Sequence, residues 1–279
     1  MSENHTRTPD DPEKEHEREE RELEADDMAR PSAPTVYEVI AQDGQEEMHR
    51  PVWSLWCSAV AAGLGISISL YAMGALRVSL DGVAGAAAIE KLGYCVGFLI
   101  VMLGRLQLFT ENTITPVLPA LRERTFDAFY CVARLWTVVF AGNLVGTFCA
   151  AALPVIFPVA SDVQMAAVLD ISRHFADRSL SHSFFSAIPA GFLVAAMVWM
   201  MPSSKGFEIW TIIVITYVIA VADTSHVIVG STELFTVLLH GEMTITDLAL
   251  QIVVTGIGNI VGGTGLFAIL AYAQVSEEL

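Results

Sequence analysis

Two short clusters of polar residues interrupt apolar runs of this chain, and they contain the side chains best suited to chemistry. One cluster contains Thr110, Glu111 and Asn112, and the other contains Asp223 and His226. Hydroxyl, amide and imidazole groups can donate hydrogen bonds to an anion, and an imidazole can also exchange a proton near neutral pH. Because ionisable side chains inside apolar segments usually mark a pathway for an ion or a proton, these clusters form the candidate site.

Enzyme chemistry is disfavoured by the motifs of the chain. The sequence contains no Gly-x-Ser-x-Gly element for a nucleophilic serine and no His-Glu-x-x-His element for a catalytic metal. His226 is the one histidine that we expect deep in an apolar region, so a pair of axial haem ligands is not available. We therefore expect no catalytic residue, no metal site and no cofactor.

The elements that hold the two clusters are predicted to be membrane-spanning helices. Hydrophobic residues make up 53% of the 279 residues, charged residues make up 16%, and the apolar residues come in long blocks. A bilayer core of about 30 Å needs about 20 apolar residues per helix. The blocks predict an all-α membrane protein with six spans, at residues 52–73, 92–121, 126–156, 184–201, 210–239 and 247–273.

The second and fifth spans are predicted to be broken helices. Leu92–Gly104 and Trp210–Ala222 are both apolar runs of 13 residues, and each ends at one of the polar clusters. Such runs are too short to cross a bilayer unbroken. Two interrupted helices at matching places in two halves favour a transport site formed by inverted repeats.

A direct comparison of the halves supports a duplication. Gly142–Gly146 in the third span (GNLVG) matches Gly258–Gly262 in the sixth (GNIVG). Leu108–Thr110 and Leu234–Thr236 (both LFT) give a second match, which has a different spacing to its Gly-Asn motif. We interpret the Gly-Asn motifs as helix-packing elements, in which glycine admits close approach and asparagine bonds across the interface. The fold prediction is two inverted three-helix repeats.

The amino-terminal region is strongly acidic. The chain has a net charge of −16, and residues 1–50 hold 16 acidic and 6 basic residues. We predict three parts: a cytoplasmic tail at 1–50 that is disordered or a short helix, a pore domain at 51–275, and a short tail at 276–279. An acidic tail argues against nucleic acid as a partner. We expect no signal peptide, because the first apolar run begins at Val52. An even number of spans puts both termini on the same side, and we assign that side to the cytoplasm because an unprocessed polar tail is easier to retain than to export.

The ordered set of these features resembles the formate/nitrite transporter family over residues 50–275. The set comprises a broken second helix, a broken fifth helix with one histidine, and a Gly-Asn motif in the third and sixth spans. The wordings QLFTENT at 107–113 and DTSHVIVGS at 223–231 are most similar to the YfdC-type branch. The resemblance implies a homopentamer in the bacterial inner membrane. Each protomer would have an aquaporin-like fold and its own pore for small monovalent anions or their weak acids.

The resemblance also implies roles for individual positions. Thr110 would face His226 across the pore, and Leu108 with Phe109 would line an apolar constriction. Tyr94, Phe98 and Ile219 are its weaker candidates for a second constriction. Our further pore candidates are Asn112, Glu111 and Asp223, and the nearest candidates for the family's basic vestibule residue are Arg173, His174 and Arg178.

The chemistry of the residues agrees with passage of an anion. A half-helix that begins near the midplane points free N–H groups and the positive end of its dipole into the cavity. A naked anion crosses an apolar ring only at a high cost in free energy, so we hypothesise that the anion takes up a proton near His226 and passes as the neutral acid. The alternative is a structural histidine bonded to a backbone carbonyl that the helix break leaves free.

Charged residues near the breaks are expected either to form ion pairs or to line the pore. Arg105, Glu111, Asp223 and Glu233 all lie close to a break. We expect Arg105 and Glu233 to be paired across the fold or between protomers. For Glu111 and Asp223 pairing and pore lining both remain open, because an unpaired carboxylate in an anion pore repels the substrate.

Three positions depart from the family pattern. Gly191 stands where familiar members have an asparagine in the fourth span, and Gly230 replaces a second asparagine after the histidine. Ser225 stands before His226, where formate channels have an acid. These changes remove hydrogen-bonding groups and leave the substrate open. A neutral-solute pore of the aquaporin kind remains an alternative, although its Asn-Pro-Ala signatures are absent, and a membrane enzyme is a weaker one.

Overall fold

The compact part of the molecule begins before the first predicted span. The structure, a computed structural model, describes residues 30–278, so the acidic stretch Glu13–Asp27 lies outside the described residues. Ala33–Leu279 forms one compact unit. Helix α2 (Ala33–His49) belongs to this unit, so the boundary that we predicted at residue 50 moves to Ala33.

Helix α2 is held by one buried face. Apolar and small residues recur every three or four positions, a helix-period pattern that the surrounding charges obscured in the sequence; the buried ones are Val36, Tyr37, Ile40, Ala41, Gly44 and Met48. The Tyr37 hydroxyl donates to the Leu118 carbonyl oxygen at 3.1 Å. Burial raises the pKa of Tyr37 to about 12. This region is therefore a docked helix and not a free tail.

The rest of the unit is helical as well. In chain order it contains α3 (Val52–Ser79), α4 (Ala86–Glu90), α5 (Leu92–Leu103), η1 (Glu111–Thr113), α6 (Val117–Glu123), α7 (Phe126–Ile156), α8 (Asp162–Ala176), α9 (Leu180–Met200), η2 (Met201–Ser204), α10 (Glu208–Val221), α11 (Val227–Leu239), α12 (Ile245–Ile260), the π-helical η3 (Val261–Ala268) and α13 (Ile269–Val275). Within the described residues, five helical segments are long and apolar enough to cross a membrane, and α10 and α11 are shorter apolar helices.

Both predicted interruptions are present, and the first half of the second span is longer than expected. Helix α5 stops at Leu103, and α10 stops at Val221 before α11 starts at Val227. The α4–α5 segment covers 18 residues, Ala86–Leu103, whereas the sequence predicted 13. Arg77 donates to Glu90 at 2.8 Å, and this pairing makes the polar start of the segment compatible with the helix.

The second interruption is shorter than predicted, because residues 230–233 lie inside α11 and not in the break. Their polar side chains are satisfied by helix contacts. The Ser231 hydroxyl donates to the Ile228 carbonyl oxygen at 2.7 Å and lies 2.9 Å from Thr147 Oγ1. Thr232 Oγ1 lies 2.8 Å from Ser67 Oγ. Polar residues in this stretch therefore mark helix contacts, and they do not end the helix.

The helices pack closely through small residues. Helix α3 packs on α7, and α9 packs on α12 and η3. A Cβ atom at Gly142 would lie 2.6 Å from the Ala59 Cβ, and one at Gly258 would lie 2.6 Å from the Ala187 Cβ. Real Cβ atoms do not approach so closely, so both positions require glycine. This confirms the helix-packing interpretation of the two motif glycines.

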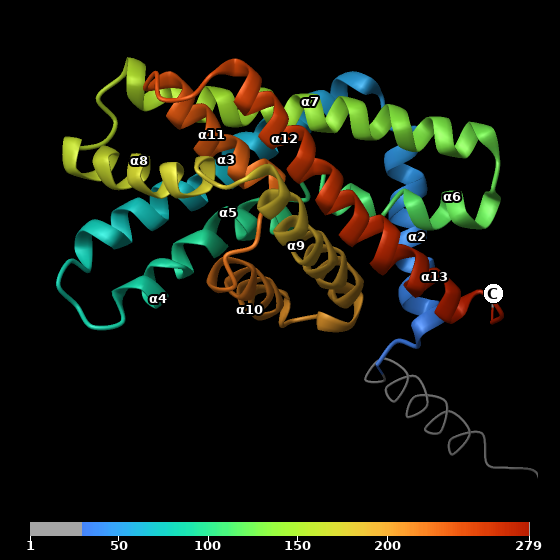
Figure 1. Cartoon of the computed structure of the whole chain (residues 1–279). Helices are drawn as coiled ribbons and strands as arrows, with labels where there is room; N and C mark the ends of the chain where they lie inside the picture. The colour runs from blue at the N-terminus through green and yellow to red at the C-terminus, as the bar shows by residue number, and fades with distance from the viewer. Residues whose placement is uncertain (1–29, 279) are drawn as a thin grey trace, which may run out of the picture. The chain divides into compact units, whose positions relative to one another are not determined.

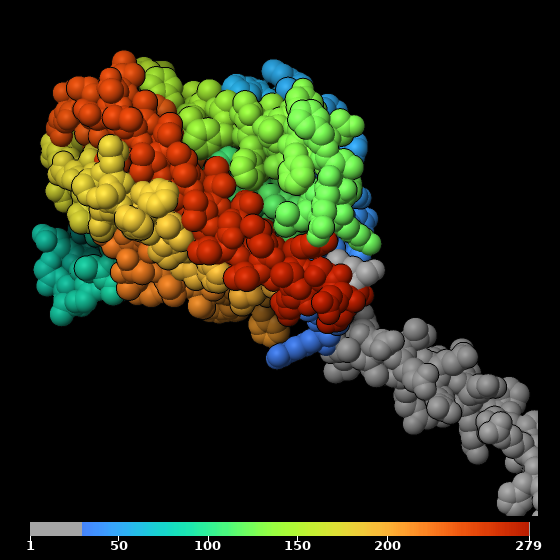
Figure 2. Space-filling model, turned by 45° about the vertical axis from the view of Figure 1, so that its right-hand side comes forward, coloured from blue at the N-terminus to red at the C-terminus, as the bar shows by residue number. Residues whose placement is uncertain are grey.

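Two groups of elements lie at opposite ends of the unit. Helices α2, α6 and α13 contact one another at one end, whereas α8 contacts α3 and α11 at the other (Figure 1). The continuous α12–η3–α13 rod crosses one face between α6–α7 and α8–α10 (Figure 2). The two helix breaks lie between these ends, and their inner residues, Gln107–Thr110 and Ser225–His226, are buried.

Candidate functional site

The two breaks have the same backbone geometry. Helices α5 and α10 are each followed by a residue in the left-handed region, Arg105 at φ 49° and Asp223 at φ 53°. In each case the next N–H donates to the carbonyl oxygen five residues back, at 3.0 Å and 3.2 Å. This is the hydrogen-bond pattern of a Schellman helix end. Both helices therefore stop through backbone turns, although the left-handed residue is not glycine in either turn.

Asn143 fastens the first break to two helices. Its Oδ1 atom accepts the Phe109 N–H at 2.9 Å. Its Nδ2 group donates to the carbonyl oxygens of Gln107 and Ala59, both at 2.8 Å. One amide of α7 thus satisfies two backbone groups in the break, on Gln107 and Phe109, and one backbone group on α3, on Ala59.

Asn259 repeats this arrangement at the second break. Its Oδ1 atom accepts the Val227 N–H at 2.9 Å. Its Nδ2 group donates to the carbonyl oxygens of Ser225 at 2.9 Å and Ala187 at 2.8 Å. We call these two sets of three hydrogen bonds the asparagine clamps. The sequence identified both asparagines but could not identify their partners in the breaks.

The two asparagine clamps bond equivalent backbone positions in the two breaks, so they show which residues of the breaks correspond. The residue between the two clamped backbone positions is Leu108 in the first break and His226 in the second. The second sequence match, between Leu108–Thr110 and Leu234–Thr236, is therefore wrong as a structural equivalence. Leu108–Thr110 lies in a break, whereas Leu234–Thr236 lies inside α11.

Thr110 and His226 meet at the centre of the site. Thr110 Oγ1 lies 2.7 Å from His226 Nε2, and the two residues are 0% and 1% exposed. His226 also caps α11, because its Nδ1 atom accepts the Val229 N–H at 3.3 Å. A neutral ring that accepts at Nδ1 carries its proton on Nε2 and donates it to Thr110. The Thr110 hydroxyl is then left with a proton for a further acceptor.

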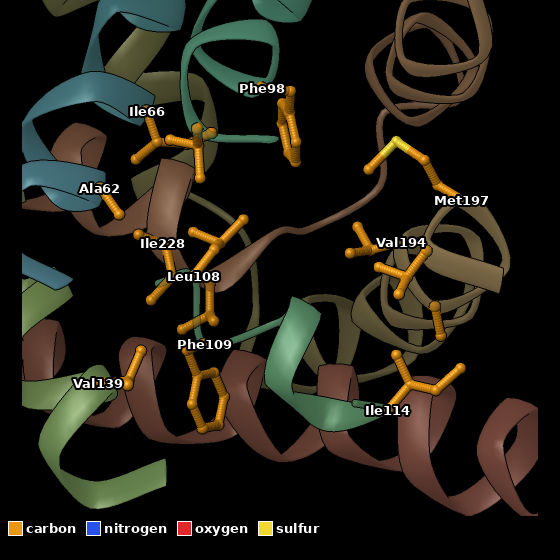
Figure 3. Packing of buried hydrophobic residues seen from close by; sticks show 14 of the residues in the cluster. Ala62, Ile66, Phe98, Leu108, Phe109, Ile114, Val139, Val194, Met197 and Ile228 are labelled. Carbon is orange, nitrogen blue, oxygen red and sulfur yellow. The ribbon is translucent and has the colours of Figure 1, made fainter. Parts of the chain in front are cut away.

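Aromatic and aliphatic side chains surround this pair. The Phe98 ring lies edge-on to the His226 ring at 5.1 Å, and the Tyr94 ring lies 5.3 Å from Phe98. Leu108 is fully buried, and Figure 3 shows it between Phe98 and Phe109. Among the residues expected at the constrictions, Leu108, Phe98 and Tyr94 are thus close to the central pair.

The Phe109 ring points away from the other residues expected at the constrictions. The Phe109 ring packs against α7, with its centroid 4.7 Å from Phe140 and 5.9 Å from Trp136. Its backbone N–H is held by the first asparagine clamp, so its side chain points away from Phe98 (Figure 3). Ile219 is fully buried, and its carbonyl oxygen accepts two hydrogen bonds from Thr224. Backbone bonding in the first break fixes where the Phe109 side chain points, whereas the place of Ile219 at the second constriction stays a prediction.

A small cavity opens on one side of the central pair. It has a volume of about 40 Å³, and its lining residues are Met73, Lys91, Tyr94, Ile171, His174, Phe175, Arg178, Ala220, Asp223, Thr224, His226, Val229, Gly230 and Glu233. We call it the His226 vestibule. It contains three basic side chains other than His226 itself and two acidic ones, so it can attract an anion while offering a group that carries a proton.

Arg178 dominates the electrostatics of the His226 vestibule. Its guanidinium donates to Asp223 at 2.5 Å and to Ser225 at 2.8 Å, and it lies 4.9 Å from the centre of the Phe175 ring. The side chain is 8% exposed. Its Nε atom is buried and has no partner within residues 30–278. Asp223 is thereby paired, which resolves one of the two carboxylates left open by the sequence.

The other two basic residues predicted for the vestibule differ in position. His174 lines the cavity and lies 3.1 Å from Asp223. Arg173 forms a two-point ion pair with Glu242, at 2.6 Å and 2.5 Å. The hydrogen bond from Arg173 lowers the pKa of Glu242. Arg173 does not line the cavity, because the Glu242 loop holds its side chain outside.

A larger cavity lies on the other side of the breaks. Its volume is about 570 Å³, and its lining residues are Val39, Ile40, Asp43, Glu46, Glu47, Arg50, Met102, Arg105, Leu106, Gln107, Glu111, Thr115, Val198, Met201, Pro202 and Glu208. We call it the Glu111 vestibule. Five of these residues are acidic and two are basic. No pattern in the sequence indicated this cavity, because α2 supplies much of its wall.

Helix α2 reaches the first break through Glu47. The carboxylate of Glu47 accepts from Gln107 Nε2 at 2.9 Å and from Thr115 Oγ1 at 3.0 Å. Burial raises the pKa of Glu47. The predicted substrate residue Asn112 belongs to this network, since its amide donates to Gln107 Oε1 at 3.0 Å. Asn112 therefore holds the break together, while Glu111 lines the cavity without an ion pair within residues 30–278.

The two glycines that depart from the family pattern are packing positions. A Cβ atom at Gly191 would lie 2.7 Å from the Asn259 Cα, and one at Gly230 would lie 2.7 Å from a ring atom of Phe175. Gly191 lets α9 touch the backbone of the clamp helix. Gly230 makes room for the Phe175 ring beside the cavity. Neither position has space for an asparagine side chain in this packing.

Comparisons with known proteins identify the family. The formate/nitrite transporter model matches residues 34–273. The chain is 39% identical to the inner membrane protein YfdC of Escherichia coli over 274 residues, which covers 97% of this chain and 88% of that protein. It is 26% identical over 257 residues to formate-nitrite transporter 3 of Toxoplasma gondii, covering 86% of this chain and 50% of that protein.

Solved structures share the fold. An FNT family ion channel superposes with a TM-score of 0.74 at 14% identity, over 86% of this chain and 98% of the other. A pentameric formate channel with formate bound superposes with a TM-score of 0.70 at 18% identity, over 81% and 98%. The match of the family model, which begins at α2 and ends in α13, shows that this chain belongs to the formate/nitrite transporter family.

Proposed function

We propose that the protein is a channel or transporter for small monovalent anions or their weak acids, with one pore in each protomer. The path runs from the His226 vestibule, past Thr110 and His226, to the Glu111 vestibule. The observation that carries this proposal is the buried 2.7 Å contact between Thr110 and His226, where the two helix breaks meet between the two cavities.

The backbone at the second break favours an anion beside this pair. Helix α11 is 13 residues long and begins at Val227, directly after His226. The Val227 and Val229 N–H groups of its first turn are already bonded, but the positive end of its dipole still stabilises negative charge close to the histidine. The free hydroxyl proton of Thr110 supplies a donor for a carboxylate or nitrite oxygen.

The apolar surroundings favour a neutral species for the crossing itself. The Phe98 ring lies edge-on to His226, and fully buried Leu108 is two residues before Thr110. Desolvating a small anion there costs several kcal/mol. The Glu111 vestibule beyond has an excess of carboxylates, which would repel an anion that arrives without its proton. Passage as the neutral acid avoids both costs.

The assembly and its placement follow from the family. We infer a homopentamer in the bacterial inner membrane, in keeping with the pentameric formate channel and with the inner membrane protein among the similar proteins. The matching clamps and helix ends support two inverted three-helix repeats. Contacts among α2, α6 and α13 put both ends of the unit on the side of the Glu111 vestibule, which we assign to the cytoplasm.

The substrate cannot be inferred from the missing asparagines, because Gly191 and Gly230 are packing positions. The test is uptake by proteoliposomes of formate, nitrite, hydrosulfide, acetate and lactate over a series of pH values. We expect flux that rises in acid for at least one of these. Thr110→Val keeps the shape of the side chain and removes its hydroxyl, so it should slow that flux about tenfold or more, the effect of losing one hydrogen bond to a charged group.

Two results would contradict the proposal. One is absence of flux for every anion from liposomes that contain folded pentamer. The other is rapid water or glycerol flux in light-scattering measurements without any anion flux, which would instead identify a neutral-solute pore.

A further inference from the structure

Glu233 has an unusual position in the His226 vestibule. It lies on α11 seven positions after His226 and three after Gly230, and all three residues line the same cavity. The residue is 6% exposed. We expected its carboxyl group to be paired, but within residues 30–278 it has no hydrogen bond and no ion pair. It therefore points into the cavity as a free group.

The neighbouring carboxylates contrast with Glu233. Asp223 bonds to Arg178 and His174, and Glu242, outside the cavity, bonds to Arg173. A buried carboxyl group without a partner destabilises the fold, unless it is protonated or meets a ligand. Such a group inside a membrane protein usually has a function.

His226 is a poor candidate for the group that supplies the proton. Its Nδ1 atom accepts the Val229 N–H, and its Nε2 atom is bonded to Thr110. Taking up a second proton would break the cap of α11. The ring is better suited to donate a hydrogen bond to Thr110 and to hold it in place.

We propose that Glu233 is the proton carrier of the His226 vestibule, which protonates the incoming anion before it reaches Thr110. This inference rests on the proposed transport function. In the step, the O–H bond of the Glu233 carboxyl group breaks and an O–H bond of the substrate acid forms. Lys91 and Arg178 stabilise the resulting carboxylate, which then takes a proton from water at the mouth of the vestibule. Each anion is thus accompanied by one proton.

Glu233 and His226 lie at different levels of the same cavity. Seven residues of α-helix span about 10 Å, so Glu233 lies about that far along α11 from His226. Helix α11 runs from the break towards the exposed Glu242 loop. Because both residues line the same cavity, an anion held in the vestibule can meet Glu233 before it reaches Thr110. The charged and titratable groups that face this position are Lys91, Tyr94, His174, Arg178, Asp223 and His226.

The mechanism selects a class of substrate. Anions of weak acids, such as formate, nitrite and acetate, can accept a proton from a carboxyl group. Chloride and nitrate are anions of strong acids and cannot do so, although they have a similar size and charge. Passage should depend on basicity and not only on size.

The principal test uses Glu233→Gln, which keeps the shape and removes the exchangeable proton. In proteoliposomes with a pH-sensitive dye inside, wild-type uptake of formate or acetate should acidify the interior and rise as the external pH falls from about 8 to about 5. The variant should lose this rise, with uptake at least about tenfold slower in acid. Glu233→Asp should restore part of it. Glu277→Gln, an exposed change near the carboxyl terminus, is the matched control and should behave as wild type.

The outcomes separate the inference from the proposed function. Absence of flux in wild type would overturn the transport function and this inference with it. Flux in wild type that is unchanged in Glu233→Gln would overturn the inference alone. Rapid chloride or nitrate uptake through the wild-type protein would also overturn it.

A second measurement uses the wild-type protein and does not depend on folding of the variant. Dicyclohexylcarbodiimide reacts with protonated carboxyl groups in apolar surroundings, and peptide mass spectrometry locates the product. Labelling at Glu233 that blocks uptake, and that acetate slows, supports the inference. Uptake that continues after full labelling of Glu233 overturns it.

Discussion

The asparagine clamp at the second break can be tested by removing its side chain. Asn259→Ala leaves the Val227 N–H and the carbonyl oxygens of Ser225 and Ala187 without their partner. Asn259 is fully buried, so water does not replace the amide easily. The break should then lose its fixed shape, and with it the position of His226.

The magnitude follows from the number of bonds. Hydrogen bonds between buried groups of membrane proteins contribute about 1 kcal/mol each. Loss of the three bonds therefore predicts a decrease of about 3 kcal/mol in the free energy of unfolding. Asn259→Asp keeps the acceptor and loses the donors, so it should cost a similar amount or more.

The assay is reversible unfolding in mixed detergent micelles, combined with anion uptake by the same variants. Thr255→Ala is the matched control. Thr255 lies one turn before Asn259 on α12, is 1% exposed, and has a hydroxyl oxygen without a partner within residues 30–278. Its loss should change the free energy of unfolding by less than about 1 kcal/mol. Asn143→Ala, at the other clamp, should behave like Asn259→Ala.

Two results for Asn259→Ala would contradict the role of the clamp. If Asn259→Ala loses no more stability than Thr255→Ala, the hydrogen bonds do not hold the break. If Asn259→Ala is destabilised but transports at the wild-type rate, the clamp stabilises the fold without positioning His226.

Three further changes test other parts of the structure. Gly191→Ala should lower the free energy of unfolding by about 2 kcal/mol, because its methyl group meets the α12 backbone. Gly256→Ala should not, because a Cβ atom there would lie at an ordinary contact distance of 3.7 Å from Val227; equal free energies of unfolding for the two variants would contradict the packing interpretation. Phe175→Ala should widen the cavity beside Gly230 and raise lactate uptake relative to formate by at least about threefold, and an unchanged ratio would contradict this. Burial raises the pKa of Glu47 above its usual 4.5, so the contribution of Glu47 to stability is full below pH 4.5 and is lost as the pH rises. In thermal unfolding, Glu47→Gln should therefore lose less stability than wild type as the pH rises above 4.5, and identical pH profiles for the two proteins would contradict this expectation.

Much of the architecture could be predicted, because lipid imposes strong rules on a sequence. The third span, Phe126–Ile156, was predicted to the residue, since an unbroken apolar block can only cross as a helix. The breaks after Leu103 and Val221 were visible as polar clusters in apolar runs. The beginning of the unit at Ala33 was missed, because charged residues conceal the apolar stripe of α2.

The site was predicted only in part, because its geometry depends on contacts between distant segments. Thr110 and His226 were identified by type and local context, and the structure brings them together. Phe109 was assigned to a constriction, but the Asn143 clamp turns its ring towards α7. Local sequence could not reveal that direction, since it is set by an amide 34 residues away.

The sequence by itself determined that the chain lies in a lipid bilayer, how many long apolar blocks it has, and the two places where a helix has to stop. These features depend only on composition and on the length of the apolar runs. Only the tertiary structure decided which polar groups are satisfied and which are free. Asp223 and Glu233 are both carboxylates near the same break. Arg178 reaches the first and leaves the second facing the cavity. That difference arises from the packing of α8 on α11, which brings together side chains that no local pattern relates.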